Sequence, residues 1–180
     1  MSKIGKKNIS IPKDSSIKIE GDNLTITGPK GTKKLTINDK IFSSKLMENE
    51  YQILPLEKKI DKKTSIMWGT YRSLINNAIM GVSSGHEKTL ELNGVGFRAN
   101  IKGENLNLQI GFSHDVNFKI PKEVKISVEK QTIIKIIGVD KDLVSKIAAD
   151  IKNLKPVEPY KGKGIKEKGQ YVLRKEGKKK

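Results

Sequence analysis

The chain has 180 residues, a formal net charge of +16 at pH 7 and no cysteine. This length suits one large domain or two small ones, and the lack of cysteine excludes a disulfide scaffold and cysteine-liganded zinc. The charge favours a polyanionic partner, with nucleic acid ahead of an anionic membrane face and a merely solvating basic surface as the alternative. Only Arg72, Arg98 and Arg174 are arginine. Lysine lacks the bidentate fork that reads guanine, so the composition favours contact with the phosphate backbone over base reading.

The first half of the chain predicts a small antiparallel sheet and one helix. Apolar residues alternate in three short segments that are separated by the turn sequences EGDN and GPKG, and a fourth strand is predicted at Tyr51–Leu54. The alternating pairs are Ile17 and Ile19, Leu24 and Ile26, and Leu35 and Ile37. From Ser65 to Val82 the apolar spacing becomes helical, which predicts an amphipathic helix that packs on the sheet. Trp68 on this helix is expected to lie in the core or at a domain boundary.

The second half predicts the same elements again. Six alternating segments precede a helical pattern over residues 140–154, and the stretch from Ile120 to Gly138 matches that from Ile11 to Gly28 in its Ile-Pro-Lys start, two strands and final glycine. We therefore expect an α+β fold with two similar domains from an internal duplication, each an antiparallel β-sheet packed against one α-helix. The expected domains cover residues 1–82 and 83–155. The segments are KTLELNG, GFRANIKG, NLNLQIG, VNFKIP, VKISVE and TIIKIIG.

The sequence contains no convincing catalytic, cofactor or metal motif. His86 and His114 are the only histidines, and neither belongs to a pair with metal-ligand spacing. The segment GVGFRA, from Gly94 to Ala99, formally fits a dinucleotide fingerprint, but the residues after it alternate like a hairpin where the fingerprint needs a helix. Its glycines are better explained by a bulge or a close backbone approach. We expect no cofactor, no metal, no small-molecule substrate and no enzymatic activity.

Residues 156–180 are predicted to form an extended basic C-terminal arm. From Lys155 onwards ten basic residues face three acidic ones, which is a net +7. Pro156 and Pro159 stop the preceding helix, and Gly162 and Gly164 let the backbone approach a ligand closely. With little apolar surface, such an arm is expected to stay mobile in the free protein and to order on a phosphate groove; a solvating tail is the alternative. Further candidate nucleic-acid-binding residues are Lys155, just before the arm, and Lys168, Arg174 and Lys175 within it.

Over almost its whole length the chain resembles the ribosomal protein L-six family of the large ribosomal subunit, in its bacterial or organellar form. The resemblance is carried by TITGPKG, GTYRSLINNAIMGVSSG, LNGVGFRA, LNLQIGFSHDV and, most specifically, PVEPYKGKGI from Pro156 to Ile165. Two departures affect the tail: Glu167 stands where the family usually has an aromatic residue, and Gln170 where an acidic residue is common.

The resemblance implies two duplicated α+β domains and a structural role. It implies binding to large-subunit ribosomal RNA near the sarcin-ricin loop and the landing area of translational GTPases, beside neighbouring ribosomal proteins. Lys161, Gly162, Lys163, Gly164 and Lys166 match the family's RNA-contacting tail motif, and Arg98, Ser113 and His114 fall in family motifs on loops and strand ends. Tyr160 is expected to pack or stack where the arm leaves the domain.

The rival hypotheses are a general nucleic-acid-binding or DNA-compacting protein and, more weakly, an RNA-modifying enzyme. A DNA binder is expected to carry a recognition helix rich in base-reading side chains, and neither predicted helix does. The start of the chain lacks the apolar stretch of a signal peptide, so we expect a soluble protein. The resemblance implies that it lies in the ribosome of the cytoplasm, with an organellar ribosome left open.

Overall fold

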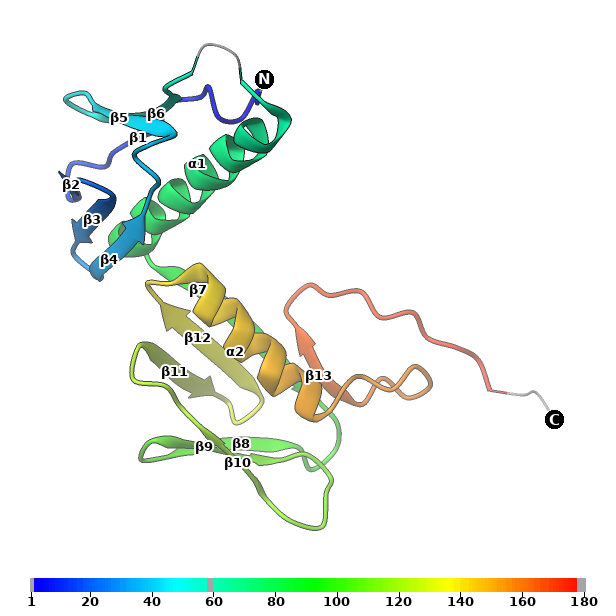
Figure 1. Cartoon of the computed structure of the whole chain (residues 1–180). Helices are drawn as coiled ribbons and strands as arrows, with labels where there is room; N and C mark the ends of the chain where they lie inside the picture. The colour runs from blue at the N-terminus through cyan, green and yellow to red at the C-terminus, as the bar shows by residue number, and fades with distance from the viewer. Residues whose placement is uncertain (1, 58–59, 178–180) are drawn as a thin grey trace. The chain divides into compact units, whose positions relative to one another are not determined.

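The computed structural model describes residues 2–57 and 60–177 and divides the chain into two compact units. The first comprises Met1–Gly85 with Val139–Lys141, and the second comprises His86–Gly138 with Asp142–Lys180. Each unit contains antiparallel sheets and one long helix (Figure 1). The predicted α+β fold with duplicated domains is therefore confirmed.

The first unit has two three-stranded antiparallel sheets, in the orders β2-β3-β4 and β1-β6-β5. The predicted first three strands are present, whereas the predicted fourth, at Tyr51–Leu54, lies in the second of these sheets. Ile19 was expected on the buried face but is 41% exposed, because it lies near the end of the edge strand β2. The strands are β1 (Ile9–Ser10), β2 (Ser16–Glu20), β3 (Asn23–Gly28), β4 (Gly31–Thr36), β5 (Phe42–Leu46) and β6 (Glu50–Pro55).

Helix α1 (Lys62–Ser83) supplies the other side of this core. Ile75, Ile79 and Val82 are at most 2% exposed and pack with the apolar residues of both sheets. Trp68 is 2% exposed and donates its indole N–H to the Ile53 carbonyl oxygen at 2.8 Å, which places it in the core as predicted. The helix ends before Gly85, whose φ of 81° is in the left-handed region that glycine adopts without strain.

The second unit also has two antiparallel sheets, ordered β11-β12-β7-β13 and β10-β9-β8. Helix α2 (Lys141–Leu154) lies over the four-stranded sheet, and its buried residues Val144, Ile147 and Ile151 share one core with both sheets (Figure 1). The strands are β7 (His86–Asn93), β8 (Arg98–Lys102), β9 (Asn105–Gln109), β10 (Val116–Lys119), β11 (Val124–Glu129), β12 (Ile133–Gly138) and β13 (Gly164–Glu167).

The matching stretches of the two halves form the same local structure. Ile11–Gly28 contains the β2–β3 hairpin, and Ile120–Gly138 contains the β11–β12 hairpin. In each unit the second strand of the hairpin lies at the centre, so that β3 is flanked by β2 and β4, and β12 by β11 and β7. The internal similarity of the sequence therefore corresponds to a repeated supersecondary structure.

The basic arm was expected to lack the apolar surface needed for order, and this prediction is wrong at β13. These four residues pair antiparallel with β7, with Ile165 opposite Leu92. The Ile165 side chain is 0% exposed and belongs to the core of the second unit. One well-placed isoleucine and a free strand edge on β7 are enough to bring this segment into the sheet, because edge N–H and C=O groups favour pairing with another extended segment.

Candidate nucleic-acid interface

The loop between α2 and β13 presents the centre of the predicted RNA motif. The Glu158 N–H donates to the Lys163 carbonyl oxygen at 2.8 Å, and the Gly162 N–H donates to the Glu158 carbonyl oxygen at 3.0 Å. These bonds close the loop, with Gly162 at a φ of 70°. Tyr160 is 56% exposed, and Lys161 and Lys163 are also exposed. The loop therefore holds two ammonium groups and a phenol ring in solvent on a hydrogen-bonded backbone.

Gly164 has a structural function that differs from the predicted one. A Cβ atom at this position would lie 2.6 Å from the Pro156 carbonyl oxygen and 2.6 Å from the Val157 Cα atom. The φ of 144° is also one that other residues rarely adopt. The close backbone approach at Gly164 is thus made to the chain's own backbone, where the loop returns to β7.

The side chains of β13 are engaged in ion pairs within the unit. Lys166 Nζ lies 3.1 Å from Glu91 Oε2 on β7. The two Glu167 oxygens accept from Lys88 and Lys152, each at 2.9 Å, and these hydrogen bonds, Lys88 first, lower the pKa of the Glu167 carboxyl group. Glu167, which departs from the family pattern, therefore ties β13 to both β7 and α2. Lys166 has its charge partly offset before any RNA is bound.

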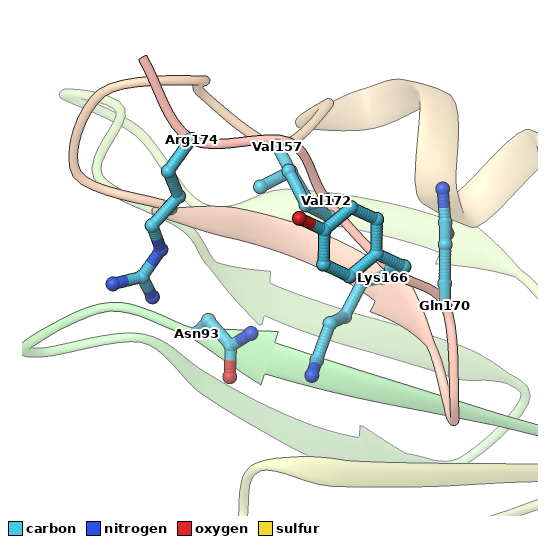
Figure 2. Close-up of a pocket in the computed structure, with 8 residues that line it drawn as sticks. Asn93, Val157, Lys166, Gln170, Val172 and Arg174 are labelled. Atoms are coloured by element: carbon cyan, nitrogen blue, oxygen red, sulfur yellow. The ribbon is translucent and has the colours of Figure 1, made fainter. Parts of the chain in front are cut away.

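Residues after β13 fold back towards the loop. The Lys175 N–H donates to the Pro159 carbonyl oxygen at 3.0 Å. Gln170 and Arg174 of this segment line a pocket of about 150 Å³ together with Asn93 and Lys166 (Figure 2). The Arg174 guanidinium is also the nearest group to a Cβ built on Gly162, at 3.0 Å. The structure therefore brings Arg174, Lys166 and Gly162 together, although they are separated in the sequence.

A larger groove, of about 620 Å³, opens on the second unit beside the end of α2. Phe97 lines this groove, and a Cβ atom added to Gly94 or to Gly111 would lie within 3.2 Å of the Phe97 ring. Gly94 of the GVGF segment and Gly111 of the β9–β10 loop therefore let the backbone pack against one phenyl ring, whereas Gly96 has no such neighbour. Strand β8 follows GVGF, with no helix there, so the hairpin interpretation of this segment is confirmed. The groove is lined by Val95, Phe97, Ile110, Gly111, Phe112, Leu154, Lys155, Pro156, Glu158 and Lys163.

Phe112 and Val95 are exposed apolar residues in this groove, and sequence reasoning missed both. Phe112 is 46% exposed and Val95 is 95% exposed. The Lys155 ammonium lies 4.4 Å from the centre of the Phe112 ring, a cation–π geometry. The His114 ring lies 6.1 Å from the Phe112 ring at an interplanar angle of 15°, so the rings are nearly parallel and offset. Two features of the sequence could have indicated this exposure. Phe112 is an aromatic residue in the polar run GFSHD, and Val95 lies between two glycines.

The remaining predicted residues line neither of these two pockets. Arg98 is exposed on β8 opposite Gln109, which hydrogen-bonds to Asp115 at 3.4 Å. Ser113 is exposed on the β9–β10 loop. Lys168 follows β13, where its N–H donates to the Thr89 carbonyl oxygen at 2.9 Å. The predicted residues are thus spread over several loops and strand ends of the second unit.

Among residues 2–57 and 60–177, no three His, Asp or Glu side chains come together in a way that could hold a metal ion. No helix in the same ranges has the length and apolarity needed to cross a membrane.

Comparison with known proteins identifies the family. The sequence profile described as Ribosomal protein L6 matches residues 11–85 and 93–168, one match in each unit. The chain is 45% identical over 180 residues to the "Large ribosomal subunit protein uL6" of Phenylobacterium zucineum (strain HLK1), covering all of both chains. It is 47% identical over 179 residues to the protein of that name from Staphylococcus carnosus (strain TM300), covering 99% of this chain and 98% of that one. On this evidence the chain belongs to the ribosomal protein L6 family.

Proposed function

We propose that this protein is a structural constituent of the large ribosomal subunit and binds large-subunit ribosomal RNA through basic residues of its second unit. The observation that carries the proposal is the hydrogen-bonded loop that holds Lys161 and Lys163 in solvent, next to the groove at the end of α2 that Lys155 lines. Ammonium groups on a closed loop can contact phosphates while losing little backbone entropy. No substrate or catalytic chemistry is part of this proposal.

The location on the ribosome is also a proposal. We propose that the bound RNA lies near the sarcin-ricin loop and the landing area of translational GTPases, with other large-subunit proteins as neighbours. This is supported by the resemblance of Pro156–Ile165 and Gly111–His114 to family motifs and by the exposure of Tyr160, Lys161, Lys163 and residues 111–114 on the second unit. The expected compartment is the cytoplasm, as part of the ribosome.

The rival hypothesis of a DNA-compacting protein has less support. Arg72 is the only arginine on α1, and it donates to the backbone oxygens of Lys7 and Asn8 at 3.4 and 3.3 Å. Arginine is the residue best suited to reading guanine in a major groove, and here its donors are used within the protein. Helix α2 carries no arginine.

The test replaces Lys161 and Lys163 together by alanine and measures binding to protein-free large-subunit ribosomal RNA. If each lysine neutralises one phosphate, the slope of log affinity against log salt should become shallower by about 1.4 to 1.8, from 0.7 to 0.9 per contact. The matched control replaces Lys18 and Lys34, two exposed lysines of the first unit, and removes the same charge. The control should keep the parental slope.

Two results would overturn the proposal. The first is an unchanged slope and affinity in the Lys161→Ala, Lys163→Ala variant together with normal incorporation into large subunits. The second is equal affinity of the parent for ribosomal RNA and for double-stranded DNA of the same length. Crosslinking followed by sequencing of the bound RNA should recover one region of the large ribosomal RNA and not dispersed transcripts.

A further inference from the structure

The groove beside α2 combines an exposed aromatic surface with cations in a way that the proposed phosphate contacts do not explain. Its size, about 620 Å³, falls within the range of roughly 300 to 1,000 Å³ that is typical of sites for small organic groups. Val95 and Phe112 leave apolar surface open to solvent in it, although folding normally favours covering such surface. Lysine–phosphate contacts need neither of these side chains.

The walls of the groove are held in place by the packing beneath them. Phe97, 8% exposed, contacts the backbone at Gly94 on one side and at Gly111 on the other. The Phe97 N–H also donates to the Gly94 carbonyl oxygen at 3.2 Å, closing the turn that carries Val95. The two loops that carry Val95 and Phe112 are therefore positioned by a shared buried ring.

The charges around the groove match an anionic, aromatic occupant. Lys155 and Lys163 line it against one carboxylate, that of Glu158. The Lys155 ammonium lies over one face of the Phe112 ring, 4.4 Å from its centre, so it can meet a phosphate attached to a group beside this ring. Unpaired bases of RNA commonly stack on phenylalanine and histidine rings, while their phosphates meet nearby lysines.

We infer that this groove seats one unpaired base of the bound RNA, stacked on Phe112, with Val95 as the facing wall and the adjoining phosphates at Lys155 and Lys163. This inference rests on the proposed function, because it assumes that the partner is RNA. It assigns the base-contacting part of the interface to two residues that carry no charge.

The experiment compares Phe112→Ala, Phe112→Leu and Phe112→Trp in the full-length chain, with protein-free large-subunit ribosomal RNA as the probe. Loss of one base stack, on the order of 1 to 3 kcal/mol, corresponds to a loss of affinity of about 5- to 150-fold for the alanine variant. Leucine keeps apolar volume but has no π-face, so the affinity of Phe112→Leu for the RNA should fall by at least about 5-fold. Tryptophan should bind about as well as the parent.

Two further measurements separate stacking from charge. The salt slope should be unchanged in all three variants, whereas Lys155→Ala should make it shallower by about 0.7 to 0.9. Chemical probing of the RNA should show one unpaired nucleotide that is protected by the parent and exposed with Phe112→Ala. The control Ile101→Ala truncates another exposed apolar residue of the same unit, 40% exposed, and should keep the parental affinity.

The outcomes distinguish this inference from the proposed function. If the parent fails to bind the ribosomal RNA specifically, the proposed function fails and the inference with it. If the parent binds and Phe112→Ala binds equally well, only the inference is overturned. It is also overturned if Phe112→Leu binds like the parent, since an apolar contact such as a protein partner provides would then suffice.

Discussion

Replacing Ile165 tests whether the basic C-terminal segment is part of the folded second unit. The side chain is 0% exposed in β13, opposite Leu92 of β7, and shares a core with α2. Truncation of a buried isoleucine to alanine costs roughly 2 to 5 kcal/mol, and truncation to valine about 0.5 to 1.5 kcal/mol. Since a domain has only about 5 to 15 kcal/mol of stability, Ile165→Val is the safer probe and Ile165→Ala the stronger one.

The assay is urea unfolding of the full-length chain, monitored by two spectroscopic signals. Trp68 is the only tryptophan and is buried in the first unit, so its fluorescence reports that unit. Far-ultraviolet circular dichroism reports both units. With an m-value near about 1 kcal/mol per molar urea, Ile165→Val should lower the midpoint of the second unit by about 0.5 to 1.5 M. The fluorescence midpoint should not move if the units unfold independently.

Leu173→Ala is the matched control, because Leu173 follows β13 but is 68% exposed. The free energy of unfolding of Leu173→Ala should stay within about 0.5 kcal/mol of that of the parent, as for most surface substitutions. The reasoning is refuted if Ile165→Ala is as stable as Leu173→Ala, since the segment would then contribute nothing to the core. It is also refuted if limited proteolysis removes residues 156–177 from the parent before it cleaves any loop.

Two further predictions concern the same segment. Glu167→Gln should lower the urea midpoint at pH 7, because the folded-state pKa of Glu167 is depressed below its ordinary value of 4.5. The stability difference from the parent should be largest above pH 4.5 and should vanish as the pH falls through the depressed pKa. A pH-independent difference between Glu167→Gln and the parent would show that the ion pairs with Lys88 and Lys152 are not the cause. Gly164→Ala should destabilise the second unit by more than Gly169→Ala, because both glycines have positive φ but only Gly164 has backbone atoms 2.6 Å from the added Cβ. Thermal unfolding of the two variants checks this, and equal melting temperatures would contradict the close approach.

The sequence predicted the local elements well because they depend on local patterns. Alternation over residues 17–37 and helical spacing over 65–82 are set by which side chains must face a core, and strands and helices formed there. The internal repeat likewise predicted that both halves contain the same hairpin. The division of each half into two sheets was not predicted, because strand pairing depends on contacts between segments distant in the chain.

The candidate site was predicted in part. Lys161 and Lys163 could be singled out because prolines, glycines and lysines in one short stretch have no core to fill. Val95 and Phe112 could not be separated from core residues by type alone, since an apolar residue is usually buried. Their exposure follows only from the tertiary structure, in which the Phe97 ring packs against Gly94 and Gly111, next to these two residues in the chain.

By itself, the sequence determined the composition-dependent properties of this protein: its strong positive charge, its α+β elements, its duplication and its resemblance to a ribosomal family. The tertiary structure decided which basic residues remain free and which glycines are structural. Lys166 pairs with Glu91, and Gly164 packs against Pro156, only because β13 adds to the edge of β7. That pairing joins residues more than seventy positions apart, and its free energy comes from burying Ile165 and completing a sheet edge, which no local pattern encodes.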